Sequence, residues 1–251
     1  MDIKIPDIEV ETRKAVSLFW KSRKLAMKSQ KALGRFDQGN RGAVTGGKNM
    51  DGFVELIKSI VVKNGLNSVD VITSSDLVTL PGFFRPTKKW DILIIHKGAL
   101  IAALELKSHV GSLGNNFNNR CEEALGTATD IWTAFREGAL GKSSKPFIGY
   151  LILVEDSEKT RRPVKEKTPN FPVFQEFKNS SYAKRYELLC ERLVKENLYT
   201  TTALLLSPPK GGLKGDYSEP NQALGLSRLM VTLAAHVAAT AVIEKTEVVS
   251  F

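Results

Sequence analysis

The chain has 251 residues, of which 42% are hydrophobic and 25% are charged. This is the balance of an ordinary globular protein, and the length allows a real core, which excludes a small scaffold dependent on disulfides or a metal. The net charge of +9 favours a polyanionic partner, and nucleic acid comes first among such partners.

The cysteines and the apolar segments bear on the cellular compartment. Cys121 and Cys190 both fall within helix-like apolar spacing, so we expect free, buried thiols and a reducing cytoplasm. No charged-then-apolar leader opens the sequence, which argues against export. The most apolar stretch, residues 229–243, is expected to be too short for a membrane span, and it contains His236. We therefore expect it to form a buried helix and expect no membrane association.

Hydrophobic periodicity and turn residues predict the secondary structure in chain order. We expect a helix over residues 8–33, a glycine-rich loop over 39–49, a helix over 51–63, a strand over 68–73, a turn at Pro81-Gly82, two strands within 90–108 joined at Lys97-Gly98, a helix over 118–137, a strand over 147–154, a loop over 155–177, a helix over 182–197, a strand over 201–207, a loop over 208–220 and a helix over 221–244. Mixed strands interleaved with helices predict one α/β domain, with a central mixed sheet flanked by helices. Residues 1–50 would supply an N-terminal helix and loop, and residues 51–251 the core.

Three charged residues interrupt the apolar segment from residue 90 to residue 108. If His96 and Leu100 flank a three-residue turn, Asp91 lies opposite Glu105, and Lys107 points to the same face of the hairpin. A two-residue turn would shift this register by one residue, so the pairing depends on the loop length.

Carboxylates on such apolar strands are costly unless something compensates their charge. A divalent cation would do so, and Mg²⁺ accepts two carboxylates while it keeps waters and a substrate phosphate. Lys107 could then orient the attacking water and stabilise the phosphate, or act as a general base if its site lowers its pKa. A plain salt bridge of Lys107 with Asp91 or Glu105 is the alternative, and the sequence does not choose between these roles.

Asp91 together with Glu105-Leu106-Lys107 resembles the PD-(D/E)xK nuclease signature, although Trp90 stands where a proline is usual. Longer segments carry a more specific likeness. Across most of the chain they resemble the XhoI-like family of type II restriction endonucleases, in residues 39–48, 108–126, 171–174 and 186–194.

The resemblance implies a restriction-endonuclease-like fold, a homodimer, Mg²⁺ held by Asp91, Glu105 and Leu106, and cleavage of double-stranded DNA at a short palindrome. A twofold dimer would match a palindrome by symmetry. The family's CTCGAG-type site is a further expectation, which a few loop changes could alter. A cytoplasmic enzyme of this type also implies a cognate DNA methyltransferase in the same cell.

The glycine-rich segment 42–49 nearly fits the phosphate-binding loop of nucleotide hydrolases. It departs from that motif because Asn49 stands where a serine or threonine should hold Mg²⁺, and because no buried strand precedes it. A loop whose Arg41, Lys48 and backbone amides meet DNA phosphates is the interpretation we favour, and a plain linker is the alternative.

Further candidates for DNA contacts surround the signature. Amide and guanidinium groups read base edges or bind phosphates, but asparagine also caps helices and builds turns. The candidates are Arg85, Lys88, Lys89, Asn115, Asn116, Asn118, Asn119, Arg120, Lys210 and Lys214. Glu55 is a possible accessory metal or water ligand, with a solvent-facing carboxylate as the alternative.

Two other functions remain open at this stage. One is a repair or recombination nuclease that reads DNA structure, and the other is a DNA-binding module without catalysis. The long family-like segments argue against the first, and the intact Asp91, Glu105 and Lys107 argue against the second.

Overall fold

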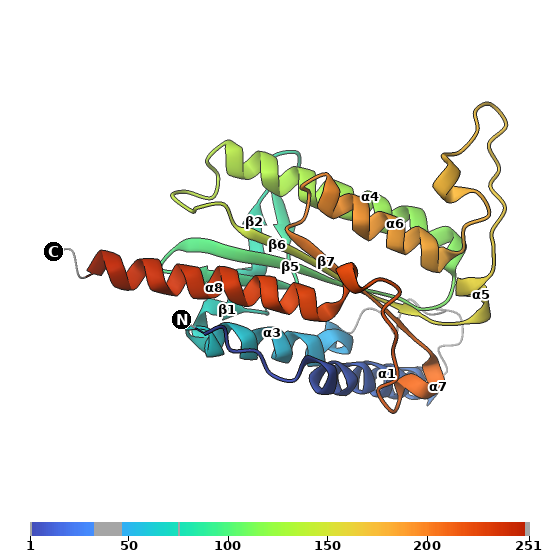
Figure 1. Ribbon diagram of the computed structural model, residues 1–251, viewed down its shortest axis with the longest axis horizontal. Helices are drawn as coiled ribbons and strands as arrows, with labels where there is room; N and C mark the ends of the chain where they lie inside the picture. The colour runs from blue at the N-terminus through green and yellow to red at the C-terminus, as the bar shows by residue number, and fades with distance from the viewer. Residues whose placement is uncertain (1, 33–46, 75, 249–251) are drawn as a thin grey trace.

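A five-stranded mixed sheet forms the centre of the computed structural model, which describes residues 2–32, 47–74 and 76–248 (Figure 1). The strands lie in the order β1 (Val71–Ile72), β4 (Ile92–His96), β5 (Ala99–His109), β6 (Phe147–Glu155) and β7 (Thr201–Ser207). β1, β4 and β5 pair antiparallel, whereas β5, β6 and β7 pair parallel. The predicted fold class, an α/β protein with a central mixed sheet, is confirmed.

Helices cover both faces of this sheet (Figure 1). On one side lie α1 (Ile8–Ala32), α3 (Asp51–Lys63) and α8 (Leu226–Val248), and on the other α4 (Leu113–Arg136) and α6 (Tyr182–Lys195). Alternation along β5 explains the two cores, because Leu104 packs into the first and its neighbour Ala103 into the second. Short helical turns complete the chain: η1 (Gly47–Met50), η2 (Ser68–Asp70), η3 (Asp76–Val78), α5 (Glu158–Arg161), η4 (Gln175–Phe177), α7 (Pro209–Gly212) and η5 (Gln222–Leu224).

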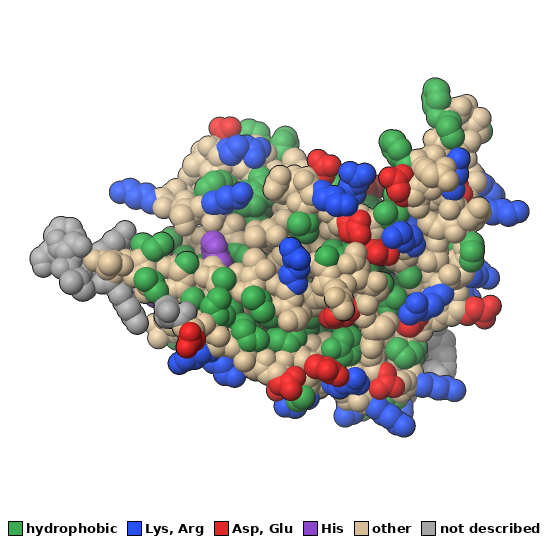
Figure 2. Space-filling model, viewed as in Figure 1, with side chains coloured by type: hydrophobic (Ala, Val, Ile, Leu, Met, Phe, Trp, Pro, Cys, Tyr) green, Lys and Arg blue, Asp and Glu red, His purple; other side chains and the backbone are tan. Residues whose placement is uncertain are grey.

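Helix α8 has the composition of a membrane span but the packing of a core helix. Residues 226–243 are long and apolar enough to cross a bilayer, so the expectation that this stretch is too short is wrong. Its inner side is nevertheless fully buried, as expected, at Leu229, Leu233 and Val237. Hydrophobic side chains also gather on the visible face over α8 and along its boundary with α3 (Figure 2).

The β4–β5 hairpin reaches the expected pairing by an unexpected route. Its turn has two residues, Lys97 and Gly98, both with positive φ (48° and 81°). Of the two turn lengths that the sequence left open, the structure has the shorter one, and the register next to the turn is shifted by one. A β-bulge at Ile101 restores it, as the pairs show: Ile92–Leu104, Leu93–Ala103, Ile94–Ala102, Ile95–Leu100 and His96–Ala99. Asp91 and Glu105 come one residue beyond the Ile92–Leu104 pair.

Several boundaries differ from the predictions. Residues 68–73 form a 3₁₀ turn and a two-residue strand rather than one strand, and α4 begins at Leu113 rather than at residue 118. In α4, Leu113 and Phe117 are buried one turn apart, which extends the apolar face backwards through an asparagine-rich stretch. A two-stranded ribbon, β2 (Thr79–Pro81) and β3 (Thr87–Lys89), stands where only a turn was expected. The short sequences of β2 and β3 do not show the repeated alternation of apolar and polar residues that marks a half-buried strand.

Candidate active site

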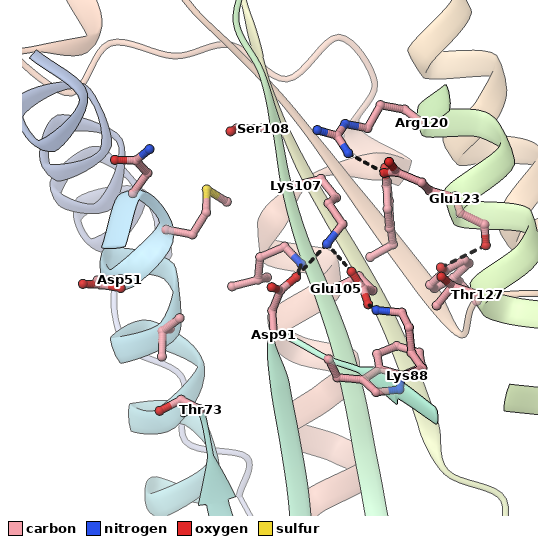
Figure 3. A pocket seen from close by; sticks show the side chains of 18 of the residues that line it. Asp51, Thr73, Lys88, Asp91, Glu105, Lys107, Ser108, Arg120, Glu123 and Thr127 are labelled. Atoms are coloured by element: carbon pink, nitrogen blue, oxygen red, sulfur yellow. Dashed lines mark hydrogen bonds and ion pairs between the residues drawn. The ribbon is translucent and has the colours of Figure 1, made fainter. Parts of the chain in front are cut away.

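Asp91, Glu105 and Lys107 come together at the open end of the β4–β5 hairpin (Figure 3). The Nζ atom of Lys107 lies 3.0 Å from Oδ2 of Asp91 and also forms an ion pair with Oε2 of Glu105. The backbone N–H of Leu106 donates a hydrogen bond of 2.8 Å to the same Asp91 oxygen. The strands thus hold both carboxylates around one ammonium group, as the hairpin pairing predicts.

The exposure of these three side chains differs sharply. The Glu105 side chain is 2% exposed, that of Lys107 24% and that of Asp91 40%. A carboxylate as deeply buried as Glu105 needs a paired positive charge. Lys88, on strand β3, provides a second one by pairing with Oε1 of Glu105.

The surroundings of Lys107 affect its pKa in opposite directions. Burial lowers the pKa of Lys107, but the carboxylates of Glu105 and Asp91 together outweigh burial, so that the pKa lies above the ordinary value of 10.5. In this arrangement the side chain is therefore an ammonium, which can donate hydrogen bonds and stabilise negative charge.

A cavity of about 1040 Å³ opens over these residues, between α3 on one side and α4 on the other (Figure 3). Four residues selected from the sequence as candidates outside the signature line it: Glu55, Arg85, Lys88 and Arg120. The size of the cavity and its mixed charge suit a phosphate backbone flanked by protein cations.

Other DNA-contact candidates lie elsewhere. Lys89 pairs with Asp76 through a 2.7 Å contact, and Asn116 donates to the Ser112 carbonyl. Outside the cavity-lining residues are also Asn118, Asn119, Lys210 and Lys214. Arg41 lies outside the described residues, and the same holds for the side chains of Lys48 and Asn115.

Two residues that the sequence did not single out contribute to the site. Tyr150 is level with Glu105 across the β5–β6 pair and lines the cavity, and its buried hydroxyl has no hydrogen-bond partner among the described residues. It is the one tyrosine in the largely apolar strand β6, which in the sequence is only a weak indication of a functional residue. Asp130, on α4, accepts hydrogen bonds from the backbone N–H groups of Phe83 and Phe84 and thereby fixes the β2–β3 ribbon beside the cavity.

The donor set fits a hard divalent cation. Asp91 and Glu105 converge on a point that accepts positive charge, since the ammonium of Lys107 bonds to both carboxylates. The described residues contain no group of three or more histidine, cysteine, aspartate and glutamate side chains placed to hold a metal. If Asp91, Glu105 and the Leu106 carbonyl held a cation, its remaining coordination positions would be open to water and phosphate, as Mg²⁺ prefers.

The two cysteines play no part in this site. Both thiols are free, as expected, and Cys190 is buried beneath the sheet. Burial raises the pKa of the Cys121 thiol to about 11 and that of Cys190 to about 12, so neither is a ready nucleophile.

Comparison with known proteins extends the likeness over most of the chain. The family described as restriction endonuclease XhoI matches residues 29–219. The type II restriction enzyme BstVI of Geobacillus stearothermophilus is 52% identical over 211 residues, 82% of this chain and 94% of that relative. The type II restriction enzyme XhoI of Xanthomonas vasicola is 48% identical over 210 residues, 83% of this chain and 84% of that relative.

A third relative is the type II restriction enzyme AbrI of Azospirillum brasilense, which is 48% identical over 172 residues, 68% of this chain and 77% of that relative. No solved structure matches. At this identity and coverage, the chain belongs to the XhoI restriction endonuclease family.

Proposed function

We propose that this protein is a type II restriction endonuclease that makes Mg²⁺-dependent double-strand cuts in DNA at a short palindromic site. The observation that carries the proposal is the convergence of Asp91, Glu105 and Lys107 in one cavity, in a chain about half identical to named restriction enzymes. Its positive net charge suits a DNA partner.

In this proposal Asp91, Glu105 and the Leu106 carbonyl hold the Mg²⁺. A bound Mg²⁺ would make its water a stronger acid and neutralise charge on the phosphate. The Leu106 N–H keeps the Asp91 carboxylate oriented, because it donates to Oδ2 of that residue. Lys107 donates hydrogen bonds to the attacking water and to the scissile phosphate, where its fixed positive charge opposes the negative charge that develops.

Binding of DNA is assigned to the basic residues around the cavity. Arg85 and Arg120 line it and can contact phosphates on either side of the scissile bond. The other candidates from the sequence remain proposed contacts, namely Arg41, Lys48, Lys89, Lys210, Lys214 and the asparagines near the start of α4. A homodimer would place two such sites on opposite strands of a palindrome. A CTCGAG-type site is the first sequence to try, because a named relative is the enzyme XhoI.

The physiological setting follows from this activity. An enzyme that cuts double-stranded DNA at a short site would damage the DNA of its own cell, so we propose a cognate methyltransferase acting on the same site. We also propose that the enzyme works in the cytoplasm, where its DNA substrate lies.

Digestion of a sequenced plasmid or phage DNA tests the proposal. Purified protein is incubated with the DNA in Mg²⁺ and in excess chelator, and the ends of any fragments are sequenced. We expect discrete Mg²⁺-dependent fragments that all end at one palindrome. Smearing would favour a structure-selective nuclease, and tight binding without cleavage would favour a DNA-binding module.

A further inference from the structure

The buried Glu105 carboxylate is held by two lysines from different parts of the fold. Lys107 pairs with Oε2 from strand β5, and Lys88 pairs with Oε1 from strand β3 (Figure 3). β3 belongs to the β2–β3 ribbon, which forms a sheet separate from the one that carries Glu105. Both carboxylate oxygens that could ligate a metal are therefore occupied by ammonium groups.

The charges of the four side chains that meet at Glu105 balance when no divalent cation is bound. Two carboxylates, Asp91 and Glu105, face two ammonium groups, Lys88 and Lys107. A divalent cation on the same carboxylates would add two positive charges within a few ångströms of both lysines, and like charges at that distance repel strongly in a buried site. One lysine has to move away from the carboxylates for the cation to bind.

Lys88 is the one that can leave. Lys107 also contacts Asp91 and has a role in the proposed cleavage, whereas Lys88 pairs with no second carboxylate among the described residues. Its ammonium already lies 5.1 Å from the centre of the Trp90 ring and donates a hydrogen bond to the Lys89 carbonyl. These two contacts can hold the ammonium after it releases Glu105, because an aromatic face attracts a cation and a carbonyl accepts its hydrogen bond.

We propose that Lys88 is a positioning residue that neutralises and orients the Glu105 carboxylate in the metal-free enzyme, and that it yields Oε1 of Glu105 to the divalent cation. The inference rests on the proposed function, since it takes the cation site to be formed by Asp91 and Glu105. Lys88 thus competes with the metal for Glu105. The position of the β2–β3 ribbon, which carries Lys88, therefore affects the affinity of the site for the metal. After release, its charge points into the cavity where the DNA phosphates lie in the proposed complex.

Chemical labelling of lysines measures this release directly. The complete protein is acetylated briefly in chelator or in excess Mg²⁺, and labelling at each lysine is read by mass spectrometry. We expect Lys88 to be protected without Mg²⁺ and to be labelled several-fold faster with it. Lys89, which is 65% exposed and paired with Asp76, is the internal control and should label equally in both conditions.

Calorimetric titration of Mg²⁺ into the protein without DNA gives the second readout. Lys88→Met removes the competitor, so we expect binding roughly three- to tenfold tighter, which corresponds to about 0.7–1.4 kcal/mol. Lys89→Met removes the same charge one residue away and should leave the affinity near that of the wild type. Lys88→Arg keeps a cation that can pair with Glu105 and should restore the weaker binding.

A third variant, Glu105→Gln, separates the possible failures. It should lose Mg²⁺ binding and leave Lys88 labelled at the faster rate in both conditions. If the wild type binds Mg²⁺ through Glu105 but Lys88 stays protected and Lys88→Met binds no tighter, the inference about Lys88 is overturned while the proposed function stands. If the wild type binds no Mg²⁺, or binds it equally after Glu105→Gln, the proposed metal site itself is wrong, and the inference about Lys88 falls with it.

Discussion

The ammonium of Lys107, on strand β5, lies 3.0 Å from Oδ2 of Asp91, which immediately precedes strand β4. The same Asp91 oxygen accepts a hydrogen bond from the backbone of Leu106. The Asp91 carboxylate therefore links the start of β4 to β5 through an ion pair with Lys107 and a hydrogen bond from the Leu106 backbone. This linkage places the two carboxylates next to each other, which is the requirement for a shared cation.

Asp91→Asn should abolish cleavage while DNA binding is retained. The amide preserves the shape of the side chain but removes a charge that a divalent cation needs. We expect a loss in kcat of more than about 100-fold, because loss of even an outer-shell partner of a metal ligand costs about 10- to 100-fold. Cleavage of plasmid DNA and gel-shift binding measure the two effects.

The matched control for this variant is Asp76→Asn. Asp76 is an exposed carboxylate paired with Lys89, and it does not line the cavity. Its loss should leave cleavage close to the wild-type rate. Equal turnover by Asp91→Asn and Asp76→Asn would refute the assignment of Asp91.

Lys107→Met should fold but cleave poorly. Methionine has nearly the volume of the lysine stem, and Lys88 still pairs with Glu105 in this variant. We expect kcat to fall by about 10²–10³-fold, the usual cost of removing one preorganised donor to a developing negative charge. Circular dichroism and denaturant melts verify the fold, and a variant that simply fails to fold would favour a structural salt bridge.

The site was readable from the sequence because its charges stand out against apolar strands. Asp91, Glu105 and Lys107 interrupt an otherwise buried run, and burial of a charge is costly enough to demand an explanation. Strands β6 and β7 were equally clear, since each is an unbroken apolar segment buried on both sides.

The β2–β3 ribbon could not be predicted from the sequence, because its position depends on tertiary contacts. Asp130 helps to hold the ribbon β2–β3 beside the site, because it binds the backbone N–H groups of Phe83 and Phe84, which precede it by 47 and 46 residues. No local pattern reports such a contact. The hairpin register expected for a three-residue turn holds for residues 92–94 although the turn has two residues, since the bulge at Ile101 offsets the shorter loop.

Gly98→Ala should weaken the protein without changing its chemistry. Gly98 has φ of 81° at the second position of the turn, where a Cβ meets no atom but the backbone conformation itself is unfavourable. A residue other than glycine costs about 1–2 kcal/mol there. Urea denaturation should show that loss in the free energy of unfolding.

Gly126→Ala provides the opposite control. Gly126 lies inside helix α4, and a Cβ added to it also meets open space. Alanine is favoured over glycine in a helix by about 0.8–1.0 kcal/mol, so this variant should be more stable than the wild type. A stabilising Gly98→Ala would show that the turn is not held in the left-handed region.

Asp130→Asn should lower stability and change the Mg²⁺ dependence of cleavage. Burial raises the pKa of Asp130, but hydrogen bonds from the Phe84 backbone, the Arg85 side chain and the Phe83 backbone together lower it below its ordinary value. Asparagine can keep the two backbone bonds but loses the charge that pairs with Arg85 at 2.7 Å. We expect a loss of about 1.5–2 kcal/mol, the low end of the range for a hydrogen bond to a charged group, because Arg85 is partly exposed.

The effect of Asp130→Asn on catalysis should follow from the position of the ribbon that carries Lys88. A looser ribbon would weaken the pairing of Lys88 with Glu105 and so lower the Mg²⁺ concentration needed for half-maximal cleavage, whereas Gly98→Ala, measured at the same temperature below both melting transitions, should leave it unaltered. If Asp130→Asn lowers stability but leaves the Mg²⁺ dependence of cleavage unaltered, the ribbon does not depend on Asp130 for its position.

Acid should destabilise the protein through histidines that folding partly or fully buries. Burial lowers the pKa of His236 below its ordinary value of 6.5, while its hydrogen bond with the Ile101 carbonyl acts in the opposite direction. The unfolded chain therefore takes up a proton at a higher pH than the folded protein does. The stabilisation from neutral His236 is complete above pH 6.5 and is lost as the pH falls from there towards the folded pKa.

His236→Gln tests this linkage because glutamine can still donate to the Ile101 carbonyl but does not titrate. Between about pH 7 and pH 5, above the range of ordinary carboxylates, the variant should lose less unfolding free energy than the wild type. Burial also lowers the pKa of His109, so some pH dependence should remain in the variant. Identical slopes for wild type and variant in urea melts would mean that His236 titrates alike in the folded and unfolded chains.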